Sequence, residues 1–128
     1  MEWIKSQGAN PKKIRLAAWG NYFDIPLLRK NYQDYDMEFP FSGTAIDVKT
    51  LGFLWLSLSG RRTDKINLPT LATELGITPE GTYHRAITDA QVTALVLVEL
   101  WKQLQGVFLP GKEGDPWAHY SLTPEDPR

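Results

Sequence analysis

The chain has 128 residues, a formal net charge of −1 at pH 7 and no cysteine. Its length suits one domain, and the lack of cysteine excludes disulfides and thiolate metal sites. The charge is not the basic excess of a nucleic-acid-binding domain, so such binding must use local clusters or metal ions. No apolar run reaches the roughly 18 residues that span a membrane, and the N-terminus does not resemble a signal peptide. We therefore expect a cytoplasmic protein without a membrane partner.

Residues 2–7 are predicted to be a short helix or the end of one. A strand is predicted over 13–19, where apolar residues alternate with Arg15 and Ala17. Asp24 has the chemistry of a helix N-cap, and the helix after it is expected to end near Tyr32. A polar and aromatic loop leads to a second strand.

The second strand, over residues 45–48, is short and is expected to be buried. The helix after it is capped by Asp47 or Thr50 and ends at Gly60. Its inward residues are predicted from their helical spacing to be Leu51, Leu54, Trp55 and Leu58. Another helix begins at Asn67 and ends at Gly76.

The last helix is predicted to be the longest. Residues 88–91 resemble a capping box, and the helix is expected to run to about Gln105 and to stop at Gly106. It is apolar over most of its circumference, which predicts deep burial. The tail from residue 110 to 128 is rich in proline and is expected to be extended or disordered.

The alternation of strands and helices predicts an α/β fold. Two strands make a poor sheet for four helices, because sheets usually contain four or more strands. This imbalance indicates that strands are missing or are supplied by another chain.

Three side chains suggest chemistry when they are taken together: Asp24, His84 and Asp89. Taken singly, each aspartate is explained as a residue at a helix N-terminus, and His84 as an ordinary loop histidine. His84 and Asp89 are five residues apart and would diverge on one continuous helix, so they converge only if His84 lies in the preceding loop. Two carboxylates and an imidazole are the equipment of a metal-assisted hydrolase.

Two motifs resemble those of the DnaQ-like 3′–5′ exonucleases of the histidine (DEDDh) type, which have an RNase H-like fold. One motif contains Asn21, Phe23 and Asp24, and the other has the form His-x-Ala-x-x-Asp-Ala. The second is matched by His84, Ala86, Asp89 and Ala90. The segments 45–48 and 68–76 are similar to family segments that lie between the motifs. The resemblance covers roughly residues 13–105, and an exonuclease-like domain is expected over 1–109.

The resemblance implies two-metal hydrolysis of single-stranded DNA or RNA from the 3′ end. It implies that Asp24 and Asp89 bind Mg²⁺ or Mn²⁺ and that His84 is the general base. Carboxylates suit such hard cations, and two ions would hold the attacking and leaving oxygens of a phosphodiester. The residues assigned to substrate binding are Asn21, Tyr22, Phe23 and Arg85.

The chain departs from the family because no Asp-x-Glu pair precedes Asn21. The only such pair is Asp36 with Glu38, in a predicted loop. We therefore expect an incomplete RNase H-like fold, a C-terminal portion without its first strands, with weak or no activity as it stands. The alternative is a non-catalytic module that forms homo-oligomers or joins a partner chain to complete its sheet.

Overall fold

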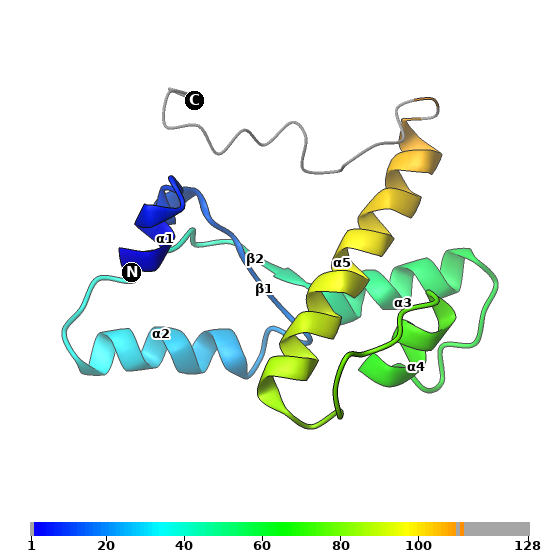
Figure 1. Cartoon of the computed structure of the whole chain (residues 1–128), viewed down its shortest axis with the longest axis horizontal. Helices are drawn as coiled ribbons and strands as arrows, with labels where there is room; N and C mark the ends of the chain where they lie inside the picture. Colours follow the sequence, from blue (N-terminus) through cyan, green and yellow to red (C-terminus); the bar gives the residue numbers. More distant parts are fainter. Residues whose placement is uncertain (1, 110, 112–128) are drawn as a thin grey trace.

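A computed structural model of the chain describes residues 2–109 and 111. Its centre is a two-stranded parallel sheet made of β1 (Leu16–Ala18) and β2 (Ala45–Asp47), with Leu16 opposite Ala45 and Ala18 opposite Asp47. Helices surround this sheet, so the predicted α/β class is confirmed (Figure 1). Both strands are shorter than predicted, and β2 is half-buried rather than buried.

Helix α2 (Asp24–Asp34) connects the two strands. The prediction that Asp24 is its N-cap is wrong, because Phe23 occupies that position and Asp24 is the first helical residue. The helix also continues two residues beyond Tyr32. Ile25 is its buried residue. The C-terminal end of α2 points away from the helices that follow β2, and most of its residues are exposed (Figure 1).

Helix α3 (Val48–Leu58) begins directly after β2, and the predicted cap is confirmed. Asp47 Oδ1 accepts hydrogen bonds from the backbone N–H groups of Lys49 at 3.0 Å and Thr50 at 3.3 Å. The predicted inward face is wrong in part, because Leu54 and Leu58 are exposed. The helix is rotated so that its glycine faces the neighbouring helix α4. The buried residues of α3 are Val48, Gly52, Trp55 and Leu56.

Helix α4 (Leu68–Glu74) is capped as predicted, since Asn67 Oδ1 accepts a hydrogen bond from the Thr70 N–H at 2.9 Å. The chain leaves the helix through Gly76, which has a φ of +72°. That backbone conformation suits glycine, so the predicted stop is also confirmed.

Helix α5 (Ala86–Phe108) is the longest element, and both of its predicted ends are wrong. It begins two residues before Thr88, whose side chain is buried inside the first turn and does not cap the helix. The helix passes Gly106, because one glycine weakens a helix without breaking it. Its predicted deep burial holds for one face, while Ile87 and Leu95 on another are at least half exposed.

The core lies where α3, α4 and α5 meet. Its buried residues are Val48, Trp55, Leu56, Leu68, Leu71, Ala72, Val92, Val96, Leu97 and Leu100. The short helix α1 (Glu2–Ser6) and a 3-10 turn (Pro11–Lys13) contribute no buried residue. Among the residues described, no helix combines the length and apolar character needed to cross a membrane. The expectation for the tail from 110 to 128 falls, apart from Gly111, outside the described residues.

Candidate active-site cleft

A cleft of about 880 Å³ runs along β1, between the N-terminal halves of α2 and α5. Figure 1 shows α2 and α5 diverging from the end of β1, with this strand between them. Most of the residues that line the cleft are apolar, from β1, α2 and α5. The polar residues that line it are Asp24, Asn67, Tyr83, His84, Asp89 and Thr93.

The cleft contains the three side chains that the sequence analysis selected. Asp24 comes from the first position of α2, Asp89 from the first turn of α5, and His84 from the loop before α5. Both carboxylates therefore lie at the positive end of a helix dipole, which stabilises their charge and which also favours anionic ligands. The order of elements explains the convergence, because both helices begin near the C-terminal end of β1.

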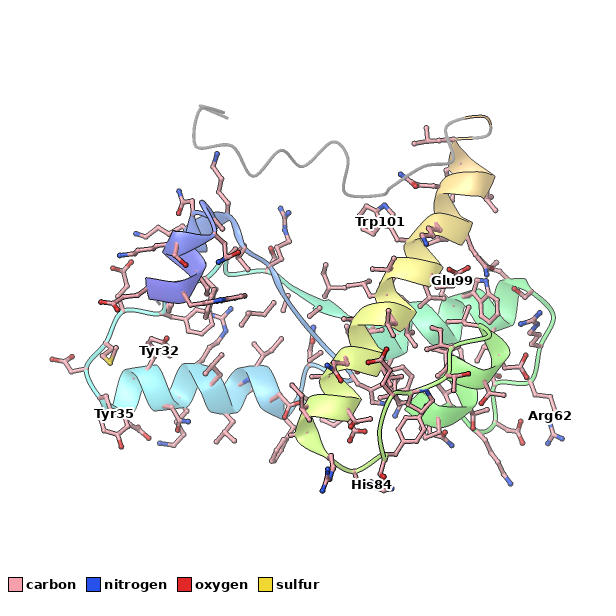
Figure 2. The ribbon with its side chains drawn as sticks, in the orientation of Figure 1. Tyr32, Tyr35, Arg62, His84, Glu99 and Trp101 are labelled. Atoms are coloured by element: carbon pink, nitrogen blue, oxygen red, sulfur yellow. The ribbon has the colours of Figure 1, made fainter. Side chains whose placement is uncertain are left out.

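His84 and Asp89 are also joined directly. The backbone N–H of His84 donates to Asp89 Oδ1 at 3.2 Å. This bond reaches back from the first turn of α5 to the loop, and His84 has a φ of +70°. A non-glycine residue rarely adopts such a conformation, and where it does so the backbone stores strain of about 1–3 kcal/mol. Figure 2 shows His84 at the exposed turn that leads into α5.

The donors in the cleft suit a divalent cation in kind but not in number. Two carboxylates are ordinary ligands for Mg²⁺ or Mn²⁺, and the nearby imidazole could accept a proton from water. In the part of the chain that the structure describes, however, no three such side chains lie close enough together to hold an ion. The residues described therefore do not form a complete metal site.

The four predicted substrate-binding residues lie beside the cleft and do not line it. Tyr22 and Phe23 form the turn that enters α2, and the two residues are 78% and 66% exposed. Asn21 is half-buried in the same turn, and Arg85 is exposed at the N-cap of α5.

Three polar residues of the cleft were not selected from the sequence: Asn67, Tyr83 and Thr93. Asn67 was predicted only as a helix cap. Thr93 lies in the interior of a helix, where its position in the sequence indicates the core. Tyr83 directly precedes His84 in the sequence, and this adjacency was the one feature from which its place in the cleft could have been predicted. The Asp36–Glu38 pair lies after the far end of α2 and outside the cleft lining, and Glu38 forms an exposed ion pair with Lys12 at 3.1 Å.

Comparisons with protein-family models, with curated proteins and with solved structures found no match to this chain. No relative therefore supplies an activity for it.

Proposed function

We propose that this chain is part of a divalent-metal-dependent 3′–5′ exonuclease of the DnaQ-like type, which acts on single-stranded nucleic-acid ends. The observation that carries the proposal is that Asp24, His84 and Asp89, from three separate segments, line one cleft. The fold assignment is part of the same proposal, in which β1 and β2 are two strands of a larger RNase H-like sheet.

Each residue has a role in this proposal. Asp24 and Asp89 provide carboxylate oxygens for Mg²⁺ or Mn²⁺, and His84 accepts a proton from the attacking water. When bound, the cations would stabilise the charge on the phosphodiester oxygens. Tyr22 and Phe23 are exposed aromatic side chains next to Asp24, which suits stacking on the terminal bases. Arg85 would hold the nucleotide through a phosphate, whereas the amide of Asn21 is engaged with the end of β2.

The missing ligands are proposed to arrive on a strand that pairs with the outer edge of β1. Among the residues described, β1 pairs with β2 alone, and the apolar cleft follows β1 along its length. An extended segment placed there would be covered by α2 and α5. An Asp-x-Glu pair on such a strand has both carboxylates on one face, because side chains two residues apart point the same way. The unmodified chain is then weakly active or inactive.

The test compares three proteins on 5′-labelled single-stranded DNA and RNA with Mg²⁺ or Mn²⁺. The first is the chain itself. The second carries, ahead of Met1 and joined by a Gly/Ser linker, a strand of alternating apolar residues that contains Asp-x-Glu. The third carries the same strand with Asn-x-Gln, as a matched control that has the shape but not the charge.

We expect stepwise shortening from the 3′ end with the Asp-x-Glu fusion only. In that fusion, His84→Ala should lower the rate by roughly 10²–10⁴-fold, the usual contribution of a general base. Asp24→Asn and Asp89→Asn should abolish the digestion that Mg²⁺ or Mn²⁺ supports, because each removes a metal ligand. The proposal fails if the Asp-x-Glu and Asn-x-Gln fusions digest equally, or if digestion survives His84→Ala unchanged.

A second candidate is a non-catalytic module that forms homo-oligomers. Among residues 2–109 and 111, it is favoured by the incomplete metal site and by the edge of β1 that pairs with no strand, since unpaired strand edges promote association. Light scattering separates the two candidates. A stable dimer of the unmodified chain, together with an inactive Asp-x-Glu fusion, would support the module. A well-folded monomer would exclude it.

A further inference from the structure

The turn between β1 and α2 is tied to the end of β2 by polar side chains. Asp47 Oδ1 accepts a hydrogen bond from the Gly20 N–H at 3.2 Å. When the Asn21 amide is oriented with Nδ2 toward β2, it donates to the Ile46 carbonyl at 3.1 Å and accepts from the Asp47 N–H at 3.2 Å. Ala18 and Asp47 are the last paired residues of the sheet, so these bonds continue the link between the strands beyond the end of β1. We refer to the side chains of Asn21 and Asp47, with the Gly20 N–H, as the clasp.

The clasp holds a turn that is confined on its other side as well. Gly20 is buried and has a φ of +85°. A Cβ at this position would lie 3.2 Å from the ring of Tyr22, so the ring packs against the glycine backbone. The chain then reaches Asp24 within four residues of Gly20. The position of the Asp24 carboxylate in the cleft thus follows from how this turn is fixed.

Capping of α3 does not require all of the contacts that Asp47 makes. Serine or asparagine serves as well as aspartate at an N-cap. Asp47 Oδ1 instead accepts from Gly20 of one segment and from Lys49 and Thr50 of another. Burial raises the pKa of this carboxyl, but hydrogen bonds from Thr50, Gly20 and Asn21 lower it overall. A charged acceptor that is shared between two segments joins them more strongly than a neutral one.

We infer that Asp47 and Asn21 are positioning residues that set the place of Asp24 in the cleft by fixing the turn from Gly20 to Phe23. Neither residue lines the cleft, so their action is indirect. That the position of Asp24 matters for activity rests on the function proposed above. The existence of the clasp rests on the hydrogen bonds alone.

The test uses nuclear magnetic resonance on the full chain and on three variants. Asp47→Ser retains an oxygen that caps α3, but its shorter side chain cannot also reach Gly20. Asp47→Asn keeps an acceptor at the full length and serves as the conservative rescue. Asn21→Ala removes the other half of the clasp and leaves the α3 cap untouched. The measurements are the hydrogen exchange of the Gly20 and Thr50 amides and the residual dipolar couplings of residues 20–25.

In Asp47→Ser we expect Gly20 exchange to rise roughly five- to tenfold, the factor for the loss of one ordinary hydrogen bond. Thr50 exchange should stay within about twofold of that in the unmodified chain, because the cap remains. The couplings of residues 20–25 should change in both Asp47→Ser and Asn21→Ala and be restored in Asp47→Asn. Couplings that stay unchanged in Asp47→Ser and Asn21→Ala would overturn the inference.

Two controls separate a released clasp from general loss of structure. The Val96 amide, in the buried face of α5, reports global opening, so its exchange corrects that of Gly20 for any loss of overall stability. Asn67→Ser shortens the equivalent cap of α4 and should leave the couplings of residues 20–25 unchanged. None of these measurements uses a cation or a nucleic acid. A negative result in the nuclease test therefore leaves the inference about the clasp standing, and a negative result here leaves the nuclease proposal standing.

Discussion

The backbone N–H of His84 and the Oδ1 atom of Asp89 lie 3.2 Å apart in a hydrogen bond that spans five residues. The two residues therefore share one local structure, in which the carboxylate at the start of α5 holds the loop that carries the imidazole. The same bond joins the proposed metal ligand to the proposed base. Changes at either residue should alter stability and geometry together.

The strained backbone of His84 can be tested with a pair of variants. At a φ of +70°, any residue with a Cβ atom is strained. Alanine has a Cβ and keeps this strain, whereas glycine has none and relieves it. We expect His84→Gly to be more stable than His84→Ala by about 0.5–1 kcal/mol, after the greater freedom of glycine in the unfolded chain is included. Urea unfolding of the two variants measures this difference. Equal stabilities would show that the loop stores no strain at this residue.

The acceptor role of Asp89 predicts a difference between two substitutions. Asp89→Ala removes the acceptor and the charge at the helix N-terminus, and should lower the free energy of unfolding by about 1–2 kcal/mol. Asp89→Asn keeps an oxygen near the His84 N–H and should cost about half as much. Chemical denaturation gives both values, and the His84 amide resonance provides a local check. A cost for Asn as large as that for Ala would mean that charge, not the hydrogen bond, dominates.

The contact between α3 and α4 depends on a glycine. A Cβ on Gly52 would lie 2.4 Å from Cδ2 of Leu71, which is itself buried in the core. Gly52→Ala should therefore destabilise the protein by about 1–3 kcal/mol through overpacking. Gly106 in α5 is the matched control, since a Cβ there meets nothing within 4 Å. Gly106→Ala should raise stability by up to about 1 kcal/mol, because alanine favours the helix. Thermal unfolding of both variants should show shifts of opposite sign.

The lowered pKa of Asp47 predicts a loss of stability in acid. The folded protein holds the pKa of this carboxyl below its ordinary value of 3.8, so the carboxyl binds the proton more weakly when folded than when unfolded. The stabilisation is fully present above the unfolded pKa and is lost as the pH falls through the folded pKa. The thermal midpoint of unfolding should thus decrease as the pH is lowered below about 4. The decrease should be smaller in Asp47→Asn, which has no carboxyl at this position. Equal falls in both proteins would assign the effect to other carboxyls, such as Asp64, whose pKa is also lowered by its bond to Arg62.

The sequence alone determined the features that depend on near neighbours. The caps at Asp47 and Asn67 and the stop at Gly76 were predicted because each acts within three or four residues of its own position. The placing of His84 in a loop followed from helical periodicity. Their residue types and the motifs around them led to the choice of Asp24, His84 and Asp89, although neither could show that the three side chains meet.

Only the tertiary structure decided that those three side chains share a cleft, because their distance depends on the register of β1 and β2 and on the packing of α5. It also decided that α5 begins before Thr88, whose hydroxyl lies too close to Gly81 for any Cβ there. Likewise, Gly52 fits against Leu71, and α3 does not bury Leu54 and Leu58 as its apolar periodicity predicted. Such contacts join residues that are distant in the chain, and local propensity carries no information about them.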